Sequence, residues 1–244
     1  MTSSCANVRR ARPLLGTYVE VAASGADPAR LHAAIDRAFF AVETVHTLMS
    51  FQEPGSELSR LNREASGREG AGIMAGLHPW TAQVLAAAAE FRDRSHGVFD
   101  AAIDGRGRVD LSGIAKGFAV DRAVEALRAA GVGQGIVNAG GDLAVFGDDA
   151  RQVAVRDPTD RSRFAATVTL RDEALASSGR AIDPRTGRLV EAIAGASVRA
   201  PSCMIADALT KVVGVLGEAA IPVLRRYGAS ALLFRRGSVV PLAA

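Results

Sequence analysis

Two lysines stand out in a chain whose other basic side chains are all arginine. Lysine and arginine together number 29 among the 244 residues, and only Lys116 and Lys211 are lysine. An ammonium is a compact charge on a flexible stem, whereas a guanidinium is a rigid planar fork. A crowded position accepts the compact charge more readily than the fork, so the two positions that keep lysine raise the question of what surrounds them. Coincidence among 29 basic positions is the alternative that the sequence leaves open.

Lys116 follows a glycine-rich turn in the segment DLSGIAKGFAVDRA, residues 110–123. Gly113, at the start of an expected helix, lets the backbone approach a ligand closely, and the free N–H groups of the first turn suit a phosphate. Lys116 lies one turn further on and reaches the same anion, and Asp110 can accept hydrogen bonds from a ribose or a base. A tight turn that only permits packing is the alternative, because the spacing fits neither the Walker A nor the GxGxxG motif.

Lys211 lies in a second helical segment, CMIADALTKVVGVLG. Asp207, Lys211 and Gly214 stand at i, i+4 and i+7, so they form one line along the helix. Asp207 borders the apolar stripe, and a carboxylate next to a core needs a cation, a metal or a cap. An ordinary exposed Asp–Lys pair explains the same spacing.

The remaining motifs are weaker. Gly140 and Gly141 precede Asp142 inside an apolar run, which indicates either a bulge or close approach of another group to the backbone. The stretch IDPRTG, residues 182–187, has the composition of a turn.

Apolar periodicity and turn residues predict the elements that position these motifs. Helices are expected at 27–50, from Ser56, at 78–97, at 113–131, from about Ser202 to 217, and at 218–227. Strands are expected at 14–25, 109–111, 135–147, 151–158, 164–179, after the 181–190 turn, from 196, and as a pair within 229–241. Strands and helices do not alternate strictly, which favours an α+β fold with mainly antiparallel sheets.

Composition narrows the class of protein. The chain is 48% hydrophobic and 23% charged with a net charge of +3, values that are ordinary for a globular protein. Aromatic residues are only 5% and no basic run is interleaved with them, so a nucleic-acid partner is not expected. The two cysteines, Cys5 and Cys203, form no disulfide framework, and the four histidines have no metal-ligand spacing. No apolar run reaches about 18 residues, so no membrane span is expected and the cytoplasm is the default.

The order of these motifs resembles the ApbE family of FAD:protein FMN transferases. The matching pieces are LLGTYVEV, LMSFQEPGSELSRLN, GVFD, VDLSGIAKGFAVDRA, IVNAGGDLAVFG, ASSG with IDPRTG, and SVRAPSCMIADALTKVVGVLG. They span nearly the whole chain, so one ApbE-type domain over residues 1–244 is expected. The resemblance implies a T-fold-like α+β architecture of antiparallel sheets and packed helices.

The same resemblance implies an activity and a site. Family members cleave FAD with the help of Mg²⁺, attach FMN through a phosphoester to a Thr or Ser of a target flavoprotein, and release AMP. The implied FAD contacts are Leu15, Phe51, Phe99, Asp100, Ala101, Asp110 and Lys116, and the glycine pair adds Gly140 and Gly141. The implied metal ligands are Asp207, the main-chain carbonyl of Gly113, and Thr210, with Asp207 and Lys211 as the catalytic pair.

The sequence departs from the family pattern in three places. Lys211 stands where the family has a metal-binding Thr, with Thr210 one step earlier. Arg180 stands where the family usually has a His before its IDP sequence, and the segment between GVFD and VDLSG is short. An ammonium cannot chelate and repels a nearby dication, so whether Mg²⁺ or Lys211 provides the cation is left open.

Because of these departures, two functions other than FMN transfer stay open. One is FAD binding by a paralogue without catalysis, and the other is a pyrophosphatase that splits FAD without an acceptor. The missing segments favour a homodimer as one option, although the sequence leaves the oligomeric state and the acceptor protein open.

Overall fold

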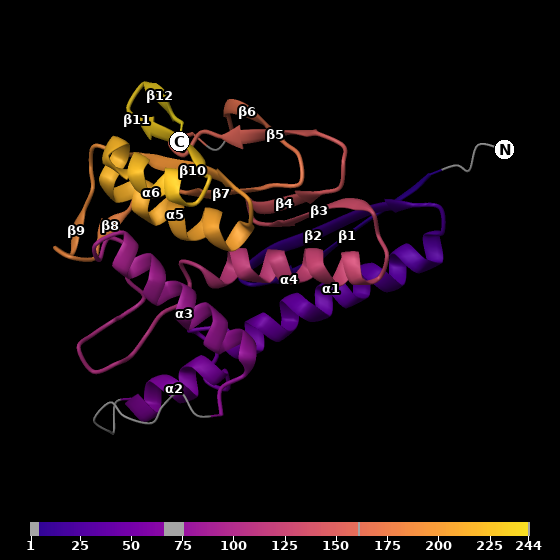
Figure 1. Ribbon diagram of the computed structural model, residues 1–244, viewed down its shortest axis with the longest axis horizontal. Helices are drawn as coiled ribbons and strands as arrows, with labels where there is room; N and C mark the ends of the chain where they lie inside the picture. The colour runs from indigo at the N-terminus through magenta and orange to yellow at the C-terminus, as the bar shows by residue number, and fades with distance from the viewer. Residues whose placement is uncertain (1–4, 66–75, 161, 244) are drawn as a thin grey trace.

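The computed structural model describes residues 5–65, 76–160 and 162–243. Its centre is an eight-stranded antiparallel sheet in the order β1-β2-β3-β4-β7-β10-β11-β12 (Figure 1). These strands are β1 (Ala6–Leu14), β2 (Thr17–Gly25), β3 (Gln134–Ala139), β4 (Asp142–Phe146), β7 (Ala174–Ser178), β10 (Gly195–Ala200), β11 (Ser230–Arg235) and β12 (Ser238–Leu242). Two short hairpins lie outside this sheet: β5 (Arg151–Arg156) with β6 (Phe164–Leu170), and β8 (Ile182–Asp183) with β9 (Arg188–Leu189).

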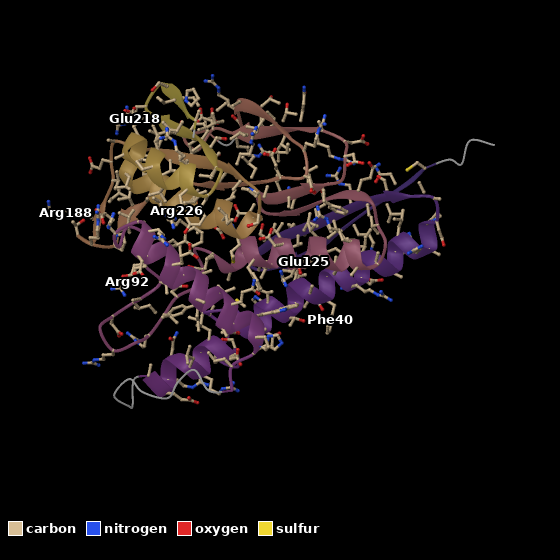
Figure 2. All side chains as sticks on the ribbon, in the orientation of Figure 1. Phe40, Arg92, Glu125, Arg188, Glu218 and Arg226 are labelled. Atoms are coloured by element: carbon tan, nitrogen blue, oxygen red, sulfur yellow. The ribbon has the colours of Figure 1, made fainter. Side chains whose placement is uncertain are left out.

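Helices cover one face of the sheet. The helices are α1 (Pro28–Met49), α2 (Glu57–Ala65), α3 (Pro79–Arg94), α4 (Ala115–Ala129), α5 (Cys203–Leu216), a 3₁₀ turn η1 (Gly217–Ala220) and α6 (Ile221–Arg226). Figure 1 shows α1, α4 and α5 lying along the sheet, with α2 and α3 beyond them. Acidic and basic side chains are mixed over the surface, as Figure 2 shows.

Strand β4 lies between two hydrophobic cores, one on each face of the sheet. All five of its residues are buried, because the two faces of the sheet are both covered there. Ala144 and Phe146 join the main core under the helices, whereas Leu143 and Val145 join a smaller core with the β5–β6 hairpin. A strand buried on both faces loses the alternation of polar and apolar residues that marks a half-exposed strand.

Helices α4 and α5 cap each other. Asp121 of α4 accepts hydrogen bonds from the backbone N–H groups of Cys203 (2.7 Å) and Met204 (2.9 Å), at the start of α5. Asp207 of α5 accepts one from the N–H of Gly117 (3.1 Å), in the first turn of α4. Helix α4 has no capping side chain at its own N-cap position, so the carboxylate from its neighbour satisfies a donor that would otherwise lack a partner.

The reciprocal capping requires the two helices to approach closely. A Cβ on Gly117 would overlap the carbonyl group of Cys203 and would lie 2.9 Å from the Cβ of Asp207. Glycine at position 117 therefore allows the contact that brings the start of α4 against α5.

Most predicted elements are present, and the differences have physical causes. The strand predicted at 14–25 begins at Thr17, and the residues before it form β1, an edge strand in which arginines at 9, 10 and 12 interrupt the apolar alternation. The expected strand at 109–111 is only an isolated bridge between Ala102 and Val109, so Asp110 lies in a loop. The strand predicted at 135–147 is a hairpin, because Gly140 and Gly141 both have positive φ and turn the chain.

Strands from both ends of the chain join one sheet, which supports the expectation of one domain over residues 1–244; that expectation stays a prediction. No helix among the described residues combines the length and apolar character that crossing a membrane requires.

Candidate functional site

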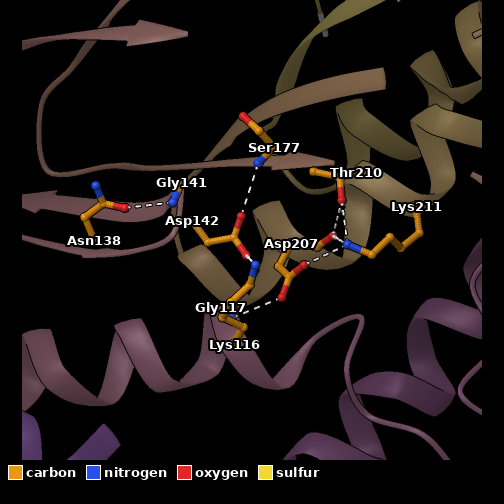
Figure 3. A network of polar contacts seen from close by, with 9 residues as sticks. All are labelled: Lys116, Gly117, Asn138, Gly141, Asp142, Ser177, Asp207, Thr210 and Lys211. Atoms are coloured by element: carbon orange, nitrogen blue, oxygen red, sulfur yellow. Dashed lines mark hydrogen bonds and ion pairs between the residues drawn. The ribbon is translucent and has the colours of Figure 1, made fainter. Parts of the chain in front are cut away.

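The two lysines of the chain each pair with a buried aspartate, and the four side chains form one cluster (Figure 3). The Nζ of Lys116 lies 2.7 Å from Oδ2 of Asp142, and the Nζ of Lys211 lies 2.9 Å from Oδ1 of Asp207. Both aspartates are only 1% exposed. We call Lys116, Asp142, Asp207 and Lys211 the lysine–aspartate quartet; its formal charges sum to zero, as burial of two carboxylates requires.

Asp207 is held on both of its oxygens. Oδ1 accepts from Lys211, and Oδ2 accepts from the N–H of Gly117. The hydroxyl of Thr210 donates to the backbone carbonyl of Asp207 (2.7 Å) and accepts from Lys211 (3.0 Å). The expected pairing at i and i+4 is therefore present, but it is a buried network rather than an exposed helix pair.

Asp142 is the buried partner of Lys116. Burial raises the pKa of the Asp142 carboxyl, and the nearby charge of Asp207 raises it further, while Lys116 opposes both effects. For Lys116, burial is the largest effect and lowers the pKa, but the charge of Asp142, its hydrogen bond and the charge of Asp207 together raise the pKa above its ordinary value. Oδ1 of Asp142 also accepts from the N–H of Ser177 (3.2 Å), so β7 helps to fix the carboxylate.

A pocket of about 650 Å³ opens beside this cluster. It lies between the β1–β2 turn, the end of α1 with the chain that follows, and the start of α4. Its lining residues are Pro13, Leu14, Leu15, Gly16, Thr17, Val45, His46, Met49, Ser50, Phe51, Gln52, Glu53, Ser112, Ala115 and Lys116. An apolar wall with a few polar groups and one fixed cation, at this volume, suits a small ligand with an anionic group.

Three of the predicted FAD contacts meet in this pocket: Leu15, Phe51 and Lys116. Gly113 lies just outside it, where a Cβ would stand 3.5 Å from Cε of Lys211 and 3.5 Å from Cε2 of Phe99. Gly113 therefore lies next to the Lys211 side chain, with little room for a larger residue between them. Phe99 itself is buried, with its ring 5.7 Å from that of Phe91.

The other predicted contacts lie away from the lining of this pocket. Asp100 forms an ion pair with Arg92 (3.3 Å), and the carbonyl of Ala101 accepts from the N–H of Asp110 (2.8 Å). The carboxylate of Asp110 accepts from the N–H of Ser112 (2.8 Å), so it orders the turn before α4.

Gly140 and Gly141 make close contacts with other residues of the protein. A Cβ on Gly140 would lie 2.5 Å from Oγ1 of Thr17, so the close approach is to a neighbouring strand's side chain. The N–H of Gly141 donates to Oδ1 of Asn138 (2.9 Å), within the β3–β4 turn. Their contact with a nucleotide stays a prediction.

Sequence reasoning missed Asp142 and Ser112. Asp142 follows the glycine pair directly, and a carboxylate that opens a fully apolar run was the available signal, since it had to find a buried partner. Ser112 lines the pocket one residue before Gly113, within the turn already singled out. Arg180 is exposed, just ahead of the β8–β9 hairpin, where Asp183 pairs with Arg185 (2.8 Å).

Comparison with curated proteins finds two relatives named FAD:protein FMN transferase. The protein from Rhodobacter capsulatus is 34% identical over 128 residues, which are 46% of this chain and 24% of that protein. The protein from Haemophilus influenzae is 34% identical over 131 residues, which are 45% of this chain and 38% of that protein. Each match therefore spans well under half of the relative's length.

Solved structures match over nearly the full chain. The flavin transferase ApbE from Vibrio cholerae has a TM-score of 0.81 at 22% identity, covering 98% of this chain and 97% of that one. An ApbE protein from Thermotoga maritima has a TM-score of 0.83 at 18% identity, covering 97% of both chains. The flavinyl transferase ApbE from Pseudomonas stutzeri has a TM-score of 0.80 at 21% identity, covering 97% and 94%. These likenesses confirm the predicted α+β architecture.

The model of the ApbE family matches residues 15–107 and 104–233, which is most of the chain and includes every member of the lysine–aspartate quartet. The chain therefore belongs to the ApbE family.

Proposed function

We propose that this protein is an FAD:protein FMN transferase. It would cleave the diphosphate of FAD, attach FMN through a phosphoester to a Thr or Ser hydroxyl of a target flavoprotein, and release AMP. The two curated relatives carry this name, and the family match extends over most of the chain.

The observation that carries the proposal is the position of Lys116. Its side chain lines the apolar pocket that Leu15 and Phe51 share, and its ammonium is fixed by Asp142 at the edge of the quartet. An isoalloxazine or adenine ring suits the apolar wall, and a diphosphate suits the fixed cation at the helix start.

The chemistry is a displacement at phosphorus. The acceptor hydroxyl oxygen forms a bond to the FMN phosphorus, the bond from that phosphorus to the bridging oxygen breaks, and AMP leaves with the electron pair. The hydroxyl proton passes to water, since Arg180 holds the place of the family's His and is not a base. In such reactions positioning and cationic groups supply most of the catalysis, and Lys116 and Lys211 supply positive charge without reorganisation.

Dependence on Mg²⁺ is what the family resemblance implies, but the groups that would hold the ion do not fit it as they are arranged. Both oxygens of Asp207 have partners, and the Thr210 hydroxyl is shared between Lys211 and the Asp207 carbonyl. Among the described residues no group of three His, Cys, Asp or Glu side chains could hold a metal ion.

The proposal is tested by incubating the purified protein with FAD and an acceptor flavoprotein or Thr-containing peptide. AMP is measured by chromatography, and flavin fluorescence is measured on the acceptor band after denaturing electrophoresis. AMP and labelled acceptor in equal amounts support transfer, whereas AMP without labelling indicates a pyrophosphatase. Release of neither product, with a panel of acceptors, contradicts catalysis.

A second candidate is FAD binding without transfer, which Lys211 and Arg180 favour because each replaces a residue that the family resemblance assigns to the chemistry. Tight binding of intact FAD with no AMP would support it. The acceptor flavoprotein as partner, the cytoplasm as location and a homodimer as assembly stay expectations alongside either function.

A further inference from the structure

The ammonium of Lys211 lies where three oxygen atoms of one helical turn converge. Its Nζ is 2.9 Å from the Asp207 carboxylate, 3.0 Å from the Thr210 hydroxyl and 3.5 Å from the Asp207 carbonyl (Figure 3). Carboxylate, hydroxyl and carbonyl oxygens are the ligand types that hard cations such as Mg²⁺ take from proteins. The ammonium therefore occupies a cation site whose ligands come from residues 207–210.

The arrangement around Asp207 is closed to a second cation. Its other carboxylate oxygen accepts from the N–H of Gly117, and the carboxylate side chain is 2% exposed. The hydroxyl proton of Thr210 is donated to the carbonyl of Asp207. A dication bound to Asp207 would need to displace the ammonium and would then meet it at short range, where like charges in a buried site repel strongly.

The ammonium is also within reach of a ligand. The Lys211 side chain is 34% exposed, and its Cε would lie 3.5 Å from a Cβ placed on Gly113, two residues before α4 begins. Lys116 is the second residue of α4, so the stem of Lys211 and the ammonium of Lys116 both lie at the segment where this helix begins. A diphosphate bound at the start of α4 would thus meet two fixed ammonium groups.

We propose that the Lys211 ammonium takes the place of a divalent cation at Asp207, so that this site binds a nucleotide diphosphate without metal. The inference deepens the proposed function and rests on it for the identity of the nucleotide. The cation site itself is independent of that identity.

The first experiment measures the cation site without any flavin. Mn²⁺ is titrated into the metal-free protein, and free Mn²⁺ is followed by electron paramagnetic resonance. The wild-type chain is expected to bind no Mn²⁺ at Asp207, whereas Lys211→Thr, which frees the carboxylate and adds a hydroxyl, is expected to gain one bound ion. Lys211→Arg keeps the positive charge and is expected to gain none.

Three results would overturn the inference. One is stoichiometric Mn²⁺ binding by the wild-type chain that Asp207→Asn abolishes. Another is a Lys211→Thr variant that folds, as judged by circular dichroism, yet gains no ion; Lys211→Ser serves the same purpose if the Thr variant does not fold. The third is a gained ion that survives in the Lys211→Thr, Asp207→Asn double variant.

The second experiment measures FAD affinity by flavin fluorescence in EDTA and in Mg²⁺. We expect the wild-type dissociation constants to agree within about twofold and Lys211→Thr to bind at least about tenfold more weakly in EDTA, with recovery in Mg²⁺. A wild-type chain that binds FAD only with Mg²⁺ contradicts the inference. A chain that binds no FAD in either medium contradicts the proposed function instead, and the Mn²⁺ titration still decides the nature of the cation.

Discussion

Lys116 and Lys211 show why a lysine differs from an arginine at a buried carboxylate. Each ammonium reaches its aspartate through one nitrogen, and the Lys211 stem passes 3.5 Å from the position of a Cβ on Gly113. A planar guanidinium needs space for three nitrogens in a fixed fork. The chain has arginine at its other Lys or Arg positions, but lysine pairs with the two aspartates that are buried between α4, β4 and α5.

Replacing Lys116 by Met should weaken FAD binding by about tenfold or more, equivalent to roughly 1.4 kcal/mol. The change removes the cation from the pocket and leaves the Asp142 carboxylate buried next to an anionic ligand. Flavin fluorescence titration measures the effect. The matched control is Arg128→Met, which removes one positive charge from the same helix at a surface pair with Asp172. Equal losses in both variants would show that only net charge matters.

Asp121 gives the stability a pH dependence. Burial raises the pKa of its carboxyl from 3.8 to about 6, against the hydrogen bonds from Met204 and Cys203. Because the folded-state pKa is the higher one, this group's stabilising contribution is complete below pH 3.8 and is lost as pH rises through about 6. A shift of this size corresponds to an upper limit of about 3 kcal/mol.

The test for Asp121 is the free energy of unfolding in urea between pH 4 and 7. Asp121→Asn keeps a side-chain acceptor and does not titrate, so its stability should vary less with pH than that of the wild-type chain. Parallel pH profiles for the two proteins would rule out Asp121 as the source.

At the scale of elements, the contact between α4 and α5 depends on its reciprocal carboxylate caps. The N-terminal residues of each helix receive a carboxylate from the other, so neither helix start can shift without breaking both sets of hydrogen bonds. Such caps are typically worth about 1 kcal/mol each. The same contact positions Lys116 and Lys211 on adjacent helices, so it sets the geometry of the site.

Gly117→Ala should destabilise the fold by about 3 kcal/mol, at the upper end for overpacking, because its methyl group would overlap the Cys203 carbonyl. Gly113→Ala is the matched control in the same segment, since its methyl group would lie at ordinary contact distances of 3.5 Å. Urea unfolding midpoints for both variants measure the difference. A Gly117→Ala protein as stable as Gly113→Ala would mean that α4 and α5 separate easily.

The helices were predictable from sequence because their buried faces repeat every three to four residues, as with Leu31, Ile35 and Phe39 of α1. Strand β1 was not, since arginines at 9, 10 and 12 interrupt the apolar alternation of this edge strand. The role of Asp142 was hidden for a different reason: burial of β4 on both faces is set by the β5–β6 hairpin, which local sequence does not reveal. In the site, the order of the motifs was enough to single out Leu15, Phe51 and Lys116. The ion pair between Lys116 and Asp142 joins distant elements, so it could be found only from the structure.

At the scale of the whole molecule, the sheet ends in two edge strands, and each contains a proline: Pro13 in β1 and Pro241 in β12. Proline has no N–H to offer another strand, so pairing of sheets between copies is disfavoured at both edges.

Binding of FAD should stabilise the whole fold. At about 100 times its dissociation constant a ligand adds about 2.7 kcal/mol, and for a chain of this size that raises Tm by roughly 5–10 °C. EDTA alone should leave Tm unchanged, because the carboxylates of the quartet are neutralised by the chain's own ammonium groups. Differential scanning calorimetry with FAD, with EDTA and with both separates these effects, and a marked loss of Tm in EDTA would indicate a structural metal.

Because lysine occurs only at positions 116 and 211, amine-reactive reagents can modify these two side chains selectively. Amine-reactive reagents do not modify arginine, so the chain offers them two side-chain amines, both in the quartet, besides a terminal amine. Reductive methylation with ¹³C-formaldehyde would therefore give a carbon spectrum of very few signals. Two of those signals would come from the ammonium groups beside Asp142 and Asp207, and each would report ligand binding at its own aspartate without mutation.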